Sequence, residues 1–153
     1  TGVEVDLQAE LGELLPWAKG FSVFANVTQL SGTAANGSTE QFPAKQVANW
    51  GVSYSRGRIG CSANWTYAGK AIDSLGAFSP DGQIYIAPAA TLDVNAQFRF
   101  TKRFRAFANV RNLTRQPAER YYEGTGLAGY ASQIFARKDL ASIRWTVGVA
   151  GEF

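Results

Sequence analysis

The chain has 153 residues, of which 46% are hydrophobic and 18% charged, so it is long and apolar enough for a folded domain and is not a disordered tail. It has no His and a single Cys, Cys61, which excludes His-based catalysis, zinc clusters and internal disulfides within this segment. The net charge is +3, but the basic residues are scattered and form no dense patch for nucleic acid.

Seven segments alternate apolar and polar residues with a period of two, which predicts β-strands that each have one apolar face. In the first, over residues 2–11, Val3, Val5 and Leu7 alternate with carboxylate and amide side chains. The other six follow in chain order at 20–30, 47–55, 58–67, 90–100, 104–112 and 143–153. An aromatic content of 13% favours the same all-β class.

The links between these strands are alternately short and long. The short ones are residues 12–20, the pair Arg56-Gly57, and residues 101–103. The long ones are predicted to be loops, at about 31–45, 69–84 and 113–140. An antiparallel meander with short turns at one end and long loops at the other is typical of outer-membrane barrels, whose periplasmic turns are the short ones.

Side-chain parity predicts the register of the hairpin at Arg56-Gly57. If these two residues form the turn, Tyr54 pairs with Ile59, and apolar residues face each other along both strands. The strand assignments on both sides of the turn are therefore mutually consistent.

The next hairpin requires a loop with an odd number of residues. With residues 101–103 as that loop, Phe100 faces Phe104 on the apolar side. On the polar side the same register places Arg99 opposite Arg105. Like charges directly opposite each other destabilise a sheet unless an anion lies nearby.

The apolar face is expected to meet lipid. Phe153 and Trp145 share this face of the last strand and are eight residues apart. At about 3.3 Å per residue and a tilt of about 40°, they are separated by roughly 20 Å of barrel height, close to the spacing of the two aromatic girdles of a membrane barrel. A soluble lipocalin-like barrel, with the apolar face inside, is the main alternative. An odd number of strands and one-sided long loops argue against it.

The last strand ends on an aromatic residue behind alternating apolar ones. This pattern resembles the C-terminal signature that the barrel-assembly machinery reads in bacterial outer-membrane proteins. The residues that match it are Phe153, Val149, Val147 and Trp145.

Three stretches resemble the C-terminal barrel segment of a TonB-dependent outer-membrane receptor. They are "PWAKGFSVFANVTQLSG", "FRAFANVRNLT" followed by "RYY", and the ending "RWTVGVAGEF". The sequence departs from the family pattern at Arg115, where an acidic or amide residue is usual, and its tyrosines Tyr121 and Tyr122 come late. The resemblance covers the order of strands and loops over residues 1–153.

The resemblance implies an antiparallel transmembrane β-barrel of about 22 strands, of which this chain supplies roughly the last seven. The chain has neither an initiating Met nor a signal peptide, and we expect it to be a fragment that lacks the plug domain and the region that binds the TonB complex. The implied function is active uptake of a bulky nutrient, of the siderophore, cobalamin or glycan class, across the outer membrane of a Gram-negative bacterium. A small passive porin-like barrel and a soluble lipocalin-like carrier are the alternatives.

No catalytic, metal or cofactor site is predicted. The carboxylates Glu4, Asp6 and Glu10 follow strand spacing on a polar face, as solvated residues of a barrel lumen do. The expected partners are membrane lipid, the plug domain and remaining strands, the TonB complex and the barrel-assembly machinery.

Two groups of residues are candidates for contacts inside and above the barrel. A basic lumen wall is formed by Arg99, Arg105, Arg111 and Arg144. Plug carboxylates or an anionic substrate could neutralise it, or solvent and salt could screen it. Substrate contacts in the long loops are expected from the aromatic residues Tyr85, Tyr121, Tyr122, Tyr130 and Phe135.

Overall fold

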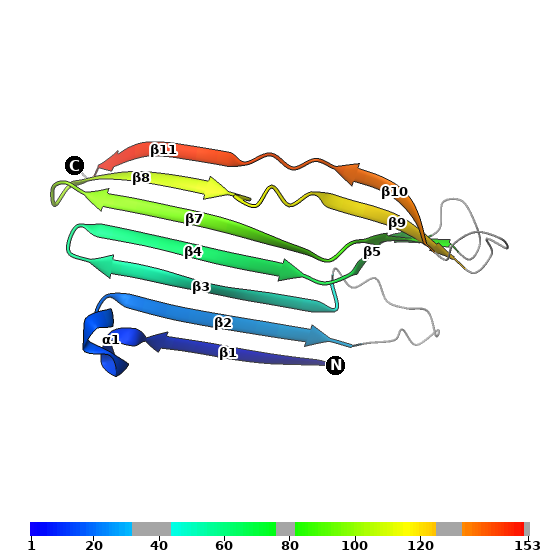
Figure 1. The fold of residues 1–153 in the computed structure, drawn as a ribbon, viewed down its shortest axis with the longest axis horizontal. Helices are drawn as coiled ribbons and strands as arrows, with labels where there is room; N and C mark the ends of the chain where they lie inside the picture. The colour runs from blue at the N-terminus through cyan, green and yellow to red at the C-terminus, as the bar shows by residue number, and fades with distance from the viewer. Residues whose placement is uncertain (32–43, 76–81, 125–132, 152–153) are drawn as a thin grey trace.

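The computed structural model describes residues 1–31, 44–75, 82–124 and 133–151, which form two antiparallel sheets placed end to end (Figure 1). The larger sheet has seven strands in the order β1-β2-β3-β4-β7-β8-β11. Their bounds are Gly2–Glu10 (β1), Phe21–Leu30 (β2), Gln46–Arg56 (β3), Ile59–Ala68 (β4), Ala89–Arg99 (β7), Phe104–Arg111 (β8) and Arg144–Gly151 (β11). The seven predicted strands and the all-β antiparallel class are confirmed. The sheet is open, with β1 and β11 at its edges.

The smaller sheet has four strands in the order β10-β9-β6-β5. It is built from Ala71–Leu75 (β5), Gly82–Ile86 (β6), Ala118–Gly124 (β9) and Gln133–Asp139 (β10). These strands lie within the segments 69–84 and 113–140, so the prediction that both are loops is wrong. Each strand continues a strand of the larger sheet: β4 leads into β5, β6 into β7, β8 into β9, and β10 into β11 (Figure 1).

The link between β1 and β2 contains a short helix, α1 (Leu11–Leu14), and a single 3-10 turn, η1 (Pro16–Ala18). The backbone N–H of Ala18 donates to the carbonyl of Leu15 at 2.8 Å, and Ala18 is buried. Within the described residues, no helix is long and apolar enough to cross a bilayer.

The register of the β3–β4 hairpin differs from the predicted one by two residues. Arg56 pairs with Ile59, so the turn is Gly57-Arg58 rather than Arg56-Gly57. Gly57 has φ +62°, and only glycine adopts a positive φ at this position without strain. Because the shift is by two residues, every side chain stays on its predicted face.

The register of the β7–β8 hairpin is the predicted one. Phe98 pairs with Ala106, and Arg99 pairs with Arg105. The stacked rings of Phe100 and Phe104 lie 6.2 Å apart at the end of this hairpin. The hydroxyl oxygen of Thr101 accepts hydrogen bonds from the backbone N–H of Arg103 and of Phe104 and closes the turn.

The larger sheet has an apolar face and a polar face, and no layer covers either one within the described residues. Val5 is 62% exposed and Val147 is 63% exposed, although both belong to the apolar face. The only buried hydrophobic side chains of the described residues are three alanines, Ala18, Ala44 and Ala71. The sheet is therefore a single-layer wall whose apolar side chains require a hydrophobic environment outside the chain.

The polar face carries a row of small polar side chains that crosses six strands at one level. Paired neighbours in this row are Ser22, Ser53, Ser62, Asn95, Asn109 and Thr146. The hydroxyl groups of Ser22 and Ser53 are hydrogen-bonded at 2.7 Å, and the side-chain amide of Asn95 donates to that of Asn109. Such cross-strand bonds fix the register of a hydrated face.

Candidate functional site

On the polar face, charged side chains lie toward the two edges of the larger sheet, on β1 at one edge and on β7, β8 and β11 toward the other. Glu4, Asp6 and Glu10 lie on β1, and the side-chain amide of Asn26 donates to the carboxylate of Glu4 at 2.8 Å. The polar faces of β2, β3 and β4, which the structure describes in full, carry only uncharged side chains. The arginines of the predicted basic wall lie on β7, β8 and β11.

These four arginines form two cross-strand pairs rather than one continuous wall. Arg99 is opposite Arg105, and Arg111 is opposite Arg144. The pairs lie at opposite ends of β8, six residues apart, which corresponds to about 20 Å along the strand. The structure thus places two separate arginine pairs on one face, and the carboxylate of Asp93 on β7, which accepts the backbone N–H of Asn112 at 2.9 Å, lies at the Arg111 end of this face.

The Arg99–Arg105 pair lines an open hollow of about 390 Å³ at the turn end of β7 and β8. Lys102 and Arg103, from the turn, also line it, and Ala150 and Gly151 of β11 form its other side together with the ring of Phe104. Among the described residues that line the hollow, none carries a carboxylate. Lys102 and Arg103 were not predicted as site residues, although four basic residues within 99–105 were a visible signal.

At the opposite end of the molecule, the smaller sheet carries a row of apolar and aromatic residues in register. Tyr85 pairs with both Ile72 and Tyr121, and Tyr121 pairs with Phe135. Paired residues of a sheet lie on the same face, so three of the predicted aromatic contacts are brought together. They lie in strands, however, and not in loops as predicted.

Tyr122 follows Tyr121 in β9 and lies on the other face, where it pairs with Ile84 and Ile134. The register continues unbroken from the pair Ala68–Ala89 of the larger sheet to the pair Ala71–Ile86 of the smaller one. Side chains therefore keep alternating between the two faces across the junction of the sheets. This alternation places Tyr85 and its row on the side that continues the polar face. Tyr130, the fifth predicted aromatic contact, lies outside the described residues.

The row is flanked by charged side chains. The Lys70 ammonium lies 3.9 Å above the ring centroid of Tyr85 and 2.5 Å from the carboxylate of Glu123. The side-chain amide of Gln133 also donates to Glu123. Partial burial raises the pKa of the Glu123 carboxyl, but these two hydrogen bonds outweigh it, so the pKa lies below its ordinary value.

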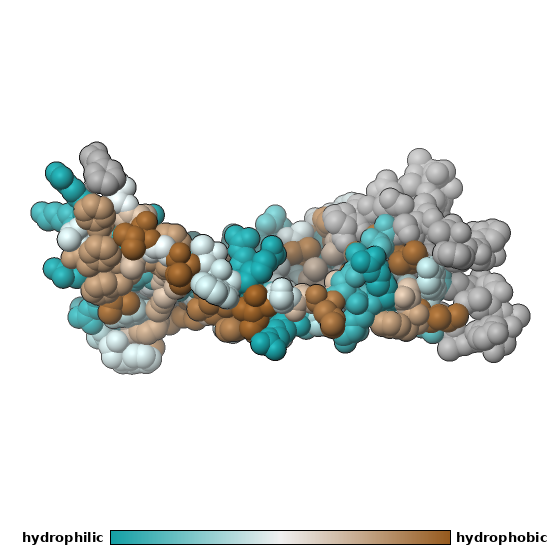
Figure 2. Space-filling model, turned by 90° about the horizontal axis from the view of Figure 1, so that it is seen from above, coloured by the Kyte–Doolittle hydropathy of each residue, from teal (hydrophilic) through white to brown (hydrophobic). Residues whose placement is uncertain are grey.

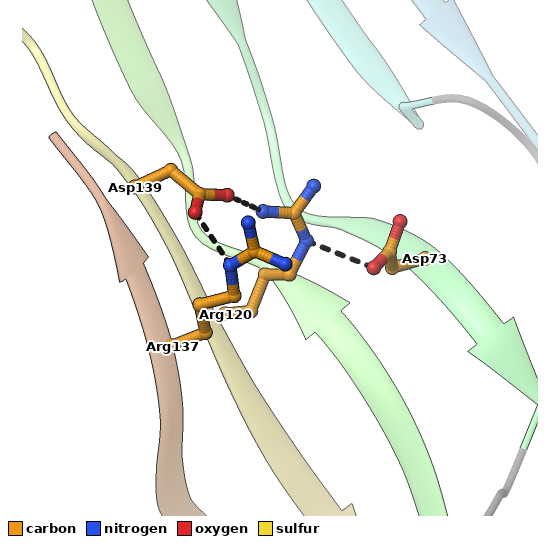
Figure 3. A network of polar contacts seen from close by, with 4 residues as sticks. All are labelled: Asp73, Arg120, Arg137 and Asp139. Carbon is orange, nitrogen blue, oxygen red and sulfur yellow. Dashed lines mark hydrogen bonds and ion pairs between the residues drawn. The ribbon is translucent and has the colours of Figure 1, made fainter. Parts of the chain in front are cut away.

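The other face of the smaller sheet has a network of ion pairs that joins three strands (Figure 3). Arg120 of β9 bonds to Asp73 of β5 at 2.9 Å and to Asp139 of β10, and Arg137 bonds to Asp139 at 2.5 Å. The hydrogen bond to Asp73 is the main cause of a raised pKa at Arg120. Desolvation acts to raise the pKa of Asp139, but the bonds from Arg137 and Arg120 lower it overall.

The connection from β8 to β9 depends on Asn112, which belongs to the "NLT" stretch noted in the sequence. Its side-chain oxygen accepts the backbone N–H of Gln116 at 2.9 Å, and its amide donates to the carbonyl of Gln116 at 3.2 Å. Asn112 has φ +53°, a conformation that asparagine adopts more readily than other non-glycine residues. The motif is thus a turn that redirects the chain between the two sheets.

In the comparison with family models, residues 1–113 match the "TonB dependent receptor-like, beta-barrel" model. This stretch covers more than half of the chain and includes the strands from β1 to β8. The chain belongs to the TonB-dependent receptor-like β-barrel family. Searches of curated proteins and of solved structures gave no match.

Membership of this family identifies the structural role of the larger sheet. The sheet is a segment of a receptor barrel wall, and the family is an outer-membrane family of transporters rather than enzymes. Within the described residues, no group of His, Cys, Asp and Glu could hold a metal ion, and Cys61 is free and exposed. For the predicted C-terminal signal, Trp145, Val147 and Val149 lie exposed on the apolar face of β11, and Phe153 lies outside the described residues.

Proposed function

We propose that this receptor barrel segment is part of the wall of an outer-membrane transporter that takes up a bulky nutrient with energy supplied through the TonB complex. The observation that carries the proposal is the match to the receptor-barrel family over residues 1–113. The exposed apolar face supports it, because lipid is the environment that such a face requires.

In this proposal, further strands pair with the open edges of β1 and β11 and close the barrel, since a barrel in a membrane has no free strand edge. A plug domain fills the lumen and faces the polar side of the sheet. The Arg111–Arg144 pair, on the polar side, would contact plug carboxylates or an anionic cargo in transit. The alternating residues that lead to Phe153 on β11 would present the signal to the barrel-assembly machinery.

We further propose that the aromatic row of the smaller sheet contacts the cargo at the outer mouth. Ring faces stack on flat or weakly polar surfaces, which siderophores, cobalamin and glycans all offer. The Lys70–Glu123 pair beside Tyr85 would supply polar contacts that orient the cargo. Exposed Phe135 ends the row on β10.

The test is binding and uptake by the complete receptor that contains this segment, with a panel of radiolabelled iron–siderophore complexes, cobalamin and oligosaccharides. One member of the panel is expected to bind and to enter cells only while the inner membrane is energised. Uptake that continues without energy, together with a large resting conductance, would contradict the proposal and favour a passive channel.

A matched pair of variants tests the aromatic row. Tyr121→Ala removes the central ring and is expected to weaken cargo binding by up to about tenfold, the effect of about 0.5–1.5 kcal/mol of lost stacking. Tyr122→Ala changes the adjacent residue on the opposite face and is expected to bind the cargo normally. Equal losses in the two variants would show that the row has no special part in binding.

A further inference from the structure

We propose that the link between β1 and β2 anchors the barrel wall in the membrane leaflet next to the short turns, at the boundary between hydrocarbon and headgroups. The anchor consists of Leu14, Leu15 and Trp17, which lie in α1, after it and in η1. Its partner is a lipid surface. The proposal goes beyond the proposed function and takes from it only the orientation of the apolar face toward lipid.

The link presents large apolar side chains to its surroundings. Leu14 is 72% exposed and Trp17 is 78% exposed, more than Leu7 on the apolar face of the preceding strand, which is 59% exposed. Side chains of this size are unfavourable in water, because their apolar surface stays hydrated. The link therefore requires a hydrophobic environment as much as the apolar face of β1 does.

These side chains project from a compact link. The backbone N–H of Leu15 donates to the carbonyl of Leu11 at 2.8 Å, and Ala18 is buried. A Cβ added to Gly12 would lie 3.0 Å from the Cα of Lys19, so the two ends of the link are packed against each other. The backbone of the link thus holds the exposed side chains in place.

The link lies at the end of the apolar face. In Figure 1, α1 is at the same end of the larger sheet as the β3–β4 and β7–β8 turns. The link leads into Phe21, whose ring centroid is 4.6 Å from that of Tyr54 on the apolar face. A Cβ added to Gly20 would meet the side chains of Tyr54 and Arg56, and Arg56 pairs with Ile59 on the same face. The end of the link therefore lies against side chains of the apolar face, and the surface that meets lipid continues into the link.

The side chains at this level suit the edge of the hydrocarbon layer. The rings of Phe100 and Phe104 lie at the same end of the sheet, and aromatic girdles mark this boundary in membrane barrels. Figure 2 shows hydrophilic residues at the turn end of the molecule and hydrophobic residues directly behind them. Tryptophan is enriched at the boundary because its ring is apolar while its indole N–H can reach water. Arg56 can extend its guanidinium to lipid phosphates while its stem stays among apolar side chains.

The test measures where the link lies in a bilayer. Leu14→Cys and Trp17→Cys each carry a nitroxide spin label in the complete receptor, with Cys61 and any other cysteine replaced, in vesicles of phosphatidylethanolamine and phosphatidylglycerol. Power saturation gives the collision rates of each label with oxygen, which concentrates in lipid, and with a water-soluble nickel chelate. Both labels are expected to favour oxygen, like a label at Val147→Cys on the apolar face of β11. A label at Glu13→Cys, the exposed polar neighbour in the same link, is the matched control and is expected to favour nickel.

The outcomes separate the anchor from the proposed function. Lipid exposure at Val147→Cys together with nickel-accessible labels in the link refutes the anchor alone, since the link then lies in water. Low collision rates with both reagents in the link also refute it, because the link then packs on the plug or on another protein. Nickel access at Val147→Cys would overturn the orientation of the sheet, and the anchor with it.

A second measurement needs no label. Leu14→Gln/Trp17→Gln removes the apolar surface and is expected to lower the temperature at which the receptor unfolds in isolated outer membranes, followed by heat-modifiable migration on gels. Glu13→Gln is expected to unfold like the wild type. Cargo uptake below the unfolding temperature should be unchanged in both variants, because the link lies at the opposite end of the molecule from the aromatic row. An unchanged unfolding temperature in the double variant would overturn the anchor, and an increased resting conductance would show that the link holds the plug instead.

Discussion

Two glycines of the polar face lie directly across from phenylalanine residues. Phe24 pairs with Gly51, and Phe107 pairs with Gly148. In each case an added Cβ would meet the ring, so the ring lies over the position of the missing glycine side chain on the next strand. This explains two aromatic residues on an otherwise hydrophilic surface, because the ring shields a backbone that has no side chain of its own.

The two glycines differ in what else an added methyl group would meet. At Gly51 it would lie 2.8 Å from the carbonyl oxygen of Ala63, which the β3–β4 ladder holds in place. At Gly148 its close neighbours are ring atoms of Phe107, which can turn aside. Gly51→Ala is therefore expected to lower the free energy of unfolding by about 1–3 kcal/mol, and Gly148→Ala by less. Urea unfolding of the complete receptor followed by Trp fluorescence measures both, and equal losses would contradict this.

Asn112, like the two glycines, has a local role. Asn112→Ala removes both side-chain hydrogen bonds to Gln116 and leaves a residue with a Cβ at positive φ. We therefore expect the free energy of unfolding to fall by roughly 1–3 kcal/mol. Asn112→Gly also removes these bonds, but glycine adopts a positive φ without strain. The free energy of unfolding should therefore fall by less than in the alanine variant. Amide hydrogen exchange in β9 gives the comparison, and an alanine variant as protected as the wild type would show that the side chain is dispensable.

At the level of elements, period-two alternation was sufficient to locate the seven strands of the larger sheet. It failed for the smaller sheet because β5 and β10 each contain an irregularity, between Ile72 and Ser74 and between Phe135 and Arg137. An irregularity of this kind shifts the parity in the middle of a short strand and hides it. The register of the hairpin at Gly57 could have been predicted from the sequence. Glycine fits the first position of a two-residue turn with positive φ, whereas the predicted turn puts Arg56 at that position.

The ion pairs of the smaller sheet predict its response to acid. The pKa values of Glu123 and Asp139 are lowered by folding, so these carboxylates stabilise the folded sheet at neutral pH. That contribution is lost as the pH falls below about 4, toward the lowered values. We expect faster amide exchange in β9 and β10 below this pH while β3 and β4 in the same sample stay protected. Asp139→Asn should already show part of the change at neutral pH, and a uniform response of all strands would contradict the prediction.

At the scale of the whole molecule, the parity of the strands determined which residues share a face, but not which of them are neighbours. The alternation predicts the four arginines on one face, and the strand register pairs Arg99 with Arg105 and Arg111 with Arg144. Their division into two pairs depended on the β8–β11 register, across a link of uncertain length. The aromatic row could not be found because Tyr85, Tyr121 and Phe135 come from three strands that were not predicted.

The two faces of β11 give the most direct test of the orientation in the membrane. Val147 lies on the apolar face, two residues from Trp145, and Thr146 lies beside it on the polar face opposite Asn109. Val147→Arg would place a charge in the hydrocarbon, which costs about 2–4 kcal/mol near the middle of a bilayer. We expect little folded receptor in the outer membrane for this variant and nearly normal amounts for Thr146→Arg. Because the two positions are adjacent, chain length, register and added charge are the same, and only the direction of the side chain differs. Heat-modifiability of the receptor in isolated outer membranes measures the folded amount, and the reverse ranking would mean that the polar face meets the lipid.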